Sequence, residues 1–198
     1  MQVILASQSP RRKKLLEQIG LKFQVLPSSI SEETDQSDPI QLVEDLAQKK
    51  ALDVAELHSD SLVIGSDTIV VHNDQILGKP KIEQDAIEML KNLSGSTHIV
   101  YTGVGFIRTD KNGMIIAQHV FYEQTKVTFS SLDESDILAY VNGGSPMDKA
   151  GAYGIQDDMG ALFVEKIEGD YYNVVGFPLN RFYRELKQFS PDIKFYGQ

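Results

Sequence analysis

The 198-residue sequence contains no cysteine, which excludes disulfide bonds and metal sites built from thiolates. It also lacks any apolar run near the ~20 residues that a membrane-spanning helix needs. The opening MQVILASQSPRRKK places a short apolar run before its basic residues, the reverse of the order in a secretory signal. We therefore expect a soluble, cytoplasmic globular protein with an ordinary hydrophobic core.

Positive charge is scarce as well. The sequence has 19 Lys and Arg against 28 Asp and Glu, a formal net charge of −9. This balance disfavours general nucleic-acid binding, which depends on a basic surface. A site for an anionic ligand must then be built locally from clustered Lys and Arg.

Several catalytic signatures are missing too. The sequence has no Walker pattern, no GxGxxG and no nucleophile elbow. The histidines do not cluster at metal-ligand spacings, so we expect them to be structural or surface residues: His58, His72, His98 and His119.

The hydrophobic pattern predicts strands that alternate with helices early in the chain and a hairpin in the middle. The expected strands are 2–6, 22–26, 61–65 with 68–72, 97–108, 114–129 and 161–167. The expected helices are 10–19, 39–57, 83–93, 133–142 and 178–188, of which the first two begin at a cap followed by proline. The expected fold is a single α/β domain over residues 1–198, with a mixed sheet flanked by helices and a cleft where two lobes meet.

The first chemical signal is the turn from Ser7 to Arg12, which follows a strand and opens a helix. A helix start is a ready site for phosphate, because its first N–H groups are unpaired and its dipole is positive there. Arg11 and Arg12 have the planar forks that match phosphate oxygens. The alternative is a solvated basic turn whose side-chain stems cover apolar surface.

The second signal is Asp67, which ends a buried strand, where α/β sheets usually place their chemistry. It would activate water or bind a divalent ion; the alternative is a turn or capping aspartate. Lys79 and Lys50 would neutralise phosphate charge, or be ordinary solvated lysines. Gln156, after two glycines in AGAYGIQ, suits the edge of a nucleobase, and a tight turn explains those glycines equally well.

Six segments then occur in one order: LASQSPRRKKLL, GSDTIV, ILGKP, LSGSTHIVYTGV, PMDKAGAYGIQ and GDYYNVVGFPL. Together they resemble the Maf family of nucleoside triphosphate pyrophosphatases, from about residue 2 to residue 186. The resemblance implies an elongated, twisted mixed sheet similar to that of inosine triphosphatases, with a deep cleft. It also implies cleavage of a nucleoside triphosphate to the monophosphate and pyrophosphate with a divalent cation, Mg²⁺ or Mn²⁺.

The same resemblance assigns roles to residues. Asp67 matches the proton acceptor, and the substrate-contacting positions are matched by Ser7, Arg11, Arg12, Lys50 and Lys79. The specificity positions are typical of the subfamily acting on dTTP and UTP: Arg12, Thr68 and Gln156. We expect the metal ligands to be Asp67 and, from the acidic loop 27–38, Glu33.

One departure from the family pattern concerns the segment after Gln156. Family sequences usually have glycine soon after this glutamine, whereas Asp157, Asp158 and Met159 come before Gly160 here. The departure bears on how Gln156 is held, and so on base preference.

Two other functions stay open. One is a non-enzymatic regulator of septum formation and cell division that binds a partner protein or nucleic acid. The other is a phosphatase that releases orthophosphate. Family analogy also predicts a homodimer.

Overall fold

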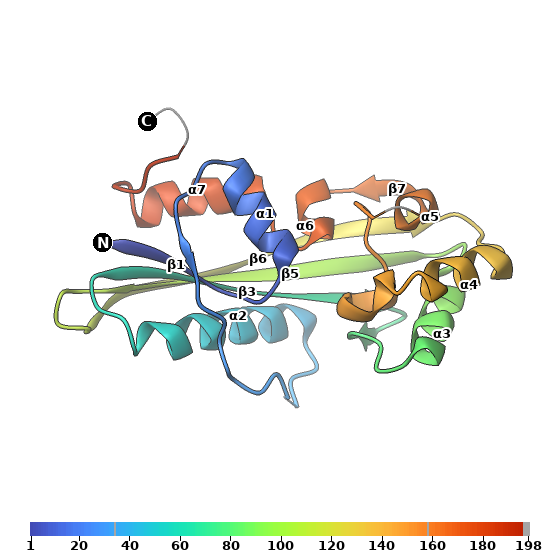
Figure 1. The fold of residues 1–198 in the computed structure, drawn as a ribbon, viewed down its shortest axis with the longest axis horizontal. Helices are drawn as coiled ribbons and strands as arrows, with labels where there is room; N and C mark the ends of the chain where they lie inside the picture. Colours follow the sequence, from blue (N-terminus) through green and yellow to red (C-terminus); the bar gives the residue numbers. More distant parts are fainter. Residues whose placement is uncertain (34, 158, 196–198) are drawn as a thin grey trace. The chain divides into compact units, whose positions relative to one another are not determined.

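The computed structural model describes residues 1–33, 35–157 and 159–195 (Figure 1). Asp158, in the acidic segment after Gln156, lies outside the described residues. The strands are β1 (Gln2–Ala6), β2 (Gln24–Val25), β3 (Ser61–His72), β4 (Gln75–Leu77), β5 (Thr97–Thr109), β6 (Ile115–Phe129) and β7 (Val164–Glu168). The helices are α1 (Pro10–Gln18), α2 (Pro39–Ala55), α3 (Glu83–Leu93), α4 (Glu134–Asn142), α5 (Gly160–Phe163), α6 (Tyr171–Val175) and α7 (Leu179–Phe189), with 3₁₀ turns η1 (Ser145–Asp148) and η2 (Ala150–Ala152).

The strands form one seven-stranded mixed sheet in the order β2-β1-β3-β5-β6-β7, with β4 paired to β3. Strand β1 runs parallel to β2 and β3, whereas β4 and β7 run antiparallel to their neighbours. The register pairs Ala6 with Gly65, so the carboxyl end of β1 lies beside the middle of β3. The predicted mixed α/β class is confirmed.

The chain divides into two compact units. Unit 1 comprises Met1–Asp67, Thr102–Glu123 and the segment from Gly176 onward, and unit 2 comprises Thr68–Tyr101 and Gln124–Val175. Strands β3, β5 and β6 contribute residues to both units.

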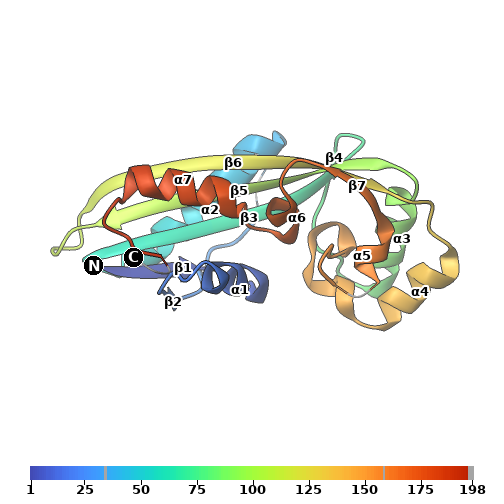
Figure 2. The same ribbon diagram turned by 90° about the horizontal axis from the view of Figure 1, so that it is seen from above.

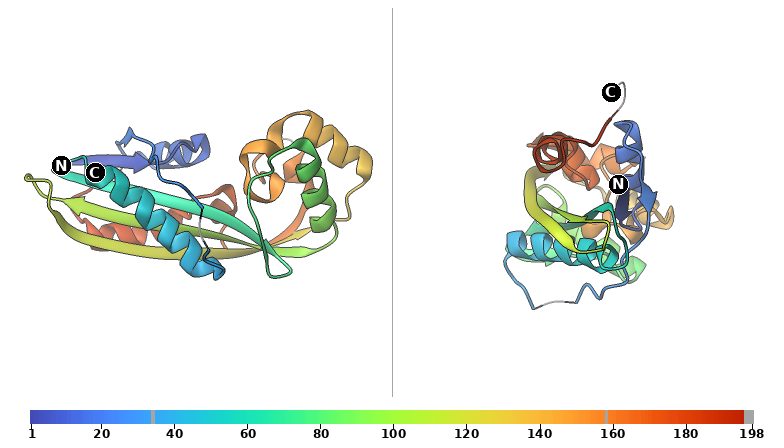
Figure 3. Two further views of the ribbon diagram at one scale, coloured as in Figure 1. Left: turned by 90° about the horizontal axis from the view of Figure 1, so that it is seen from below. Right: turned by 90° about the vertical axis from the view of Figure 1, so that its left-hand side faces the viewer.

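In unit 1, α2 covers one face of the sheet, and α1 and α7 cover the other (Figures 1 and 3). Glycines allow α2 to lie directly on the strand backbones. A Cβ at Gly65 would be 2.1 Å from the Ala47 carbonyl oxygen, and a Cβ at Gly103 would be 2.1 Å from that of Val43. Fully buried side chains such as Ile4, Ala51 and Ile107 form the core beneath this helix.

In unit 2, α3 packs against α4 (Figure 2). The core beneath them is aromatic and aliphatic, and includes Leu90, Leu93, Phe129, Tyr140 and Phe163. The turn η2 fits closely over β3, where a Cβ at Gly151 would be 2.9 Å from a methyl of Val70.

Most predicted elements are confirmed, and 61–72 is one continuous strand. The strand predicted at 161–167 is wrong in its first half, because Gly160–Phe163 is helical and β7 begins only at Val164. Helix α6 and the two 3₁₀ turns were not predicted. Within the described ranges, no helix combines the length and apolarity required to cross a bilayer.

Candidate functional site

An ion pair between Lys50 and Asp67 is the centre of the candidate site. Asp67 lies on β3 two residues after Gly65, where α2 lies directly on the strand backbone, and Lys50 projects from that helix. Lys50 Nζ is 2.7 Å from Asp67 Oδ1, and both side chains are only 11% exposed. The short contact orients each side chain toward the other. Removing either partner would leave an uncompensated buried charge, which is strongly destabilising.

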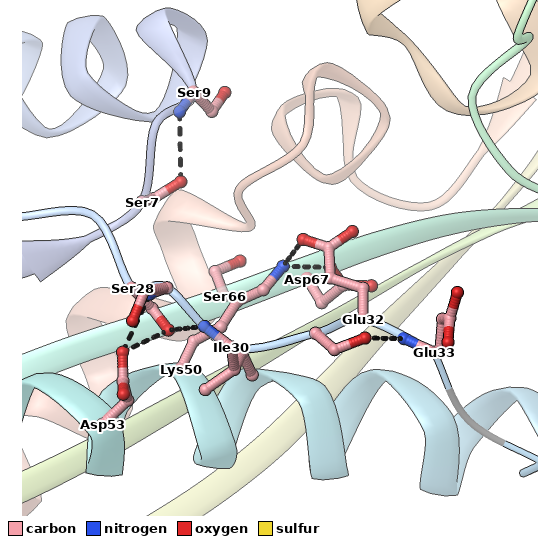
Figure 4. Close-up of polar contacts among 12 residues, drawn as sticks. Ser7, Ser9, Ser28, Ile30, Glu32, Glu33, Lys50, Asp53, Ser66 and Asp67 are labelled. Carbon is pink, nitrogen blue, oxygen red and sulfur yellow. Dashed lines mark hydrogen bonds and ion pairs between the residues drawn. The ribbon is translucent and has the colours of Figure 1, made fainter.

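A second carboxylate reaches the same ammonium. Glu32 Oε1 is 2.5 Å from Lys50 Nζ, and Figure 4 shows the two side chains turned toward each other while Glu33 points away. Sequence reasoning missed Glu32. Its only signal was the acidic loop that also contains Glu33.

The loop that carries Glu32 is anchored on α2 itself. Asp53, one turn after Lys50, accepts hydrogen bonds from Ser28 Oγ at 2.8 Å and from the Ser29 N–H at 2.9 Å. These bonds, led by that from Ser29, lower the pKa of Asp53. One helix face therefore provides both the ammonium and the anchor of the loop that covers it (Figure 4).

The turn between β1 and α1 forms as the sequence predicts. Ser9 caps α1, with its Oγ accepting from the Arg12 N–H at 3.4 Å, and Pro10 is the first helical residue. The Ser9 N–H in turn donates to Ser7 Oγ at 3.2 Å (Figure 4). Capping of this type satisfies N–H groups that a helix start leaves unpaired.

Arg12 is buried and bonds to backbone. Its Nη1 donates to the Ser66 carbonyl at 2.8 Å and to Ser7 Oγ at 3.2 Å, and its Nε donates to the Gly176 carbonyl at 3.0 Å. Burial lowers the pKa of Arg12, against the opposing effect of the negative charge on Asp67. The guanidinium thus joins the α1 turn, β3 and the segment before α7.

Ser66 has an unusual side chain. Its Oγ is buried and has no hydrogen-bond partner among the described residues. Buried hydroxyl groups are normally hydrogen-bonded, so an ordered water or another polar group would satisfy this Oγ.

The donor set is compatible with a hard divalent cation. Two carboxylate oxygens, from Asp67 and Glu32, meet at Lys50, and oxygen ligands suit Mg²⁺ and Mn²⁺. The described residues contain no group of three or more His, Asp or Glu placed to hold a metal ion. Mg²⁺ is commonly bound through one or two carboxylates, with water and phosphate oxygens completing its shell.

The structure brings four of the predicted site residues together in unit 1: Ser7, Arg12, Lys50 and Asp67. Arg11 lies beside them, half-buried on the first turn of α1. Three others belong to unit 2: Thr68, half-buried on β3, and the exposed Lys79 and Gln156. The Gln156 amide nitrogen donates to Asp157 Oδ1 at 2.7 Å.

Comparisons with known proteins bear on the family of the chain. Residues 2–189 match the family described as Maf-like protein. A Bacillus cereus (strain AH820) protein named dTTP/UTP pyrophosphatase is 52% identical over 96% of this chain and 97% of its own. Proteins of the same name from Bacillus thuringiensis subsp. konkukian and Bacillus anthracis are 52% and 51% identical, with the same coverage.

Among solved structures, the Staphylococcus aureus Ham1 protein is similar, with 13% identity, a TM-score of 0.47, and coverage of 96% of this chain and 100% of that one. Because the family match spans almost the whole sequence and the relatives are more than half identical, the chain belongs to the Maf-like family.

Proposed function

We propose that this protein hydrolyses dTTP and UTP to the nucleoside monophosphate and pyrophosphate. The names and the high identity of its relatives support this substrate class. The observation that carries the chemistry is the convergence of Asp67 and Glu32 on the Lys50 ammonium, beside a capped helix start. Such a constellation combines a candidate base with the positive charge that polyphosphate requires.

In this proposal Asp67 accepts a proton from the attacking water. Lys50 fixes the orientation of the Asp67 carboxylate through Oδ1, so that its second oxygen faces the water. Attack at the α-phosphorus then expels pyrophosphate, whose negative charge the surrounding cations stabilise. Catalysis depends on positioning and charge neutralisation more than on covalent chemistry.

The α1 turn holds the phosphates. Arg11 is half-buried at the helix start, where it would pair with phosphate oxygens. Arg12 is bound to backbone carbonyls, so its contribution is a fixed charge and the positioning of Ser7. Lys79 is also proposed to neutralise negative charge on the phosphates.

The residues that would hold a divalent cation are Asp67 and Glu32, in place of the Glu33 expected from the sequence. When bound, Mg²⁺ or Mn²⁺ neutralises charge on the phosphate oxygens. The two carboxylates would otherwise repel an anionic substrate, since Lys50 supplies one positive charge against their two negative charges.

Arg12, Thr68 and Gln156 are the proposed specificity residues.

A nucleotide panel tests the function. Purified protein is incubated with dTTP, UTP, ATP and GTP and Mg²⁺, and both pyrophosphate and orthophosphate are measured. We expect pyrophosphate from dTTP and UTP. Orthophosphate as the product, or no product from any nucleotide together with binding to a division protein, would contradict the proposal.

Two substitutions test the site. Asp67→Asn keeps the shape of the side chain but removes the base, and we expect kcat to fall by ~10²–10⁴. Stability should fall as well, because Lys50 loses one partner of a buried ion pair, so circular dichroism must show that the variant is folded at the assay temperature. Glu32→Gln and Glu33→Gln form a matched pair, in which the loss of activity and the rise in Mg²⁺ requirement should be larger for Glu32→Gln. Near-normal kcat in Asp67→Asn would overturn its role.

The family also implies a location and an assembly. We propose a cytoplasmic homodimer, which light scattering of the purified protein would test through its molar mass.

A further inference from the structure

The loop that carries Gln156 contains a buried ammonium. Lys149 is 7% exposed, and its Nζ is 2.7 Å from Asp148 Oδ1 and 2.8 Å from Asp157 Oδ2. The same ammonium donates to the Ser145 carbonyl. Although burial opposes its charge, the hydrogen bonds that it donates to the two aspartates raise the pKa of Lys149 above its usual value. Asp157 is therefore held by a permanent cation.

The other oxygen of Asp157 engages Gln156. Gln156 Nε2 donates to Asp157 Oδ1 at 2.7 Å. A carboxylate paired with an ammonium only accepts hydrogen bonds, so the amide must face it with its nitrogen. The bond to Asp157 favours the orientation in which the Gln156 nitrogen faces the carboxylate and the carbonyl Oε1 is left to face a ligand.

The backbone of the loop is shaped to close this network. The Asp157 N–H donates to the Gly154 carbonyl at 3.0 Å, which makes a tight turn. A Cβ at Gly154 would be 2.5 Å from Asp157 Oδ2, 2.8 Å from Gln156 Nε2 and 2.8 Å from Lys149 Cε. The three side chains thus close over the space that this glycine leaves open.

We propose that Asp157 is a positioning residue that sets base specificity, by orienting Gln156 so that its carbonyl Oε1 accepts a hydrogen bond from the N3–H of uracil or thymine. This inference rests on the proposed function, and deepens it. It gives a role to an aspartate at the position where the sequence departs from the family pattern.

The chemistry of the bases makes the orientation decisive. Uracil and thymine carry a donor at N3, whereas the N3 of cytosine is an acceptor. A carbonyl oxygen at this edge accepts a hydrogen bond from uracil or thymine, but meets the N3 lone pair of cytosine. An amide free to rotate would offer either its oxygen or its nitrogen to the base, and would discriminate poorly between uracil and cytosine. A pocket with one fixed acceptor is selective because the wrong base leaves buried polar groups unpaired.

The test is the ratio of kcat/KM for UTP to that for CTP in Asp157→Ala. We expect this ratio to fall about tenfold or more, the scale of one hydrogen bond to a base edge. General damage to the loop would instead lower kcat/KM for UTP and for CTP by the same factor and leave their ratio unchanged. The matched control is Asp148→Ala, which removes the other carboxylate from Lys149 without touching Gln156, and should keep the ratio.

A second variant and a double-mutant cycle complete the design. Asp157→Asn, which offers Gln156 either an oxygen or a nitrogen, should give an intermediate ratio, and it serves if Asp157→Ala does not fold. In a Gln156→Ala background, Asp157→Ala should change the ratio no further.

An unchanged ratio in folded Asp157→Ala, or equal turnover of UTP and CTP by wild type, overturns the inference while leaving the hydrolase intact. Absence of pyrophosphate release by wild type from UTP and dTTP would instead reject the proposed function itself.

Discussion

The contact between Gly65 and α2 gives a sharp prediction. Gly65→Ala would place a Cβ 2.1 Å from the Ala47 carbonyl oxygen and 2.7 Å from the Ala51 nitrogen. Both atoms are backbone, and ordinary contact begins at 3.4 Å, so the helix must retreat by more than about 1 Å from the strand. Lys50 lies between these two residues and would move with them.

Two losses should follow together. Overpacking of this severity costs ~3 kcal/mol of unfolding free energy, and displacing the ammonium by about 1 Å from Asp67 should lower kcat/KM for dTTP by ~10²-fold. Urea unfolding and steady-state pyrophosphate release measure the two effects.

A graded pair of controls belongs with this variant. At Gly105 the added Cβ would be 3.1 Å from Ala47 and Gln48, and at Gly78 it would meet nothing within 4 Å. We therefore expect a smaller destabilisation for Gly105→Ala and almost none for Gly78→Ala. If Gly65→Ala kept wild-type stability and activity, the argument that α2 lies on the bare strand backbone to place Lys50 would be refuted.

Two further predictions concern buried charge. Lys50→Met leaves Asp67 and Glu32 without their cation, and should cost ~3–5 kcal/mol in urea unfolding at low salt as well as most of the activity; wild-type stability would contradict this. Burial lowers the pKa of His98 to about 3, so the unfolded chain takes up a proton below about pH 6.5 that the folded protein refuses. The contribution of His98 to the free energy of unfolding is therefore fully present above about pH 6.5. It decreases by about 1.4 kcal/mol for each pH unit below that value. His98→Gln should lower stability at pH 7 but flatten the urea-unfolding profile between pH 6 and pH 4, and an unchanged slope would exclude His98 as the cause.

Local chemistry made much of the fold predictable. The caps Ser9 and Asp38, each followed by proline, fix the starts of α1 and α2 in the sequence itself, and the structure has both helices begin there. Residues 161–163 were predicted as strand but are helical. The apolar run ALF is too short for its periodicity to distinguish a strand from one helical turn. An element as short as α6 contains too few residues to show a period.

The site was predictable only in part, for a related reason. Asp67 was predicted at the end of a buried strand, but β3 continues through it to His72, so the expected strand-end position is wrong. The contact between Glu32 and Lys50 could not be predicted, because the loop of Glu32 is held by Asp53, which lies 24 and 25 positions from its partners in the sequence. Arg12 donates to the carbonyls of Ser66 and Gly176, which are distant in sequence, so nothing local in the sequence shows these two contacts.

The bond from Arg12 to Gly176 spans 164 residues. During synthesis, a ribosome makes the helix that carries this arginine long before it makes the acceptor. A nascent chain, or one that terminates early, would keep the guanidinium at β3 with a missing partner. The bond from Arg12 to Gly176 can therefore form only near the end of translation, and shortened products of the gene would lack it.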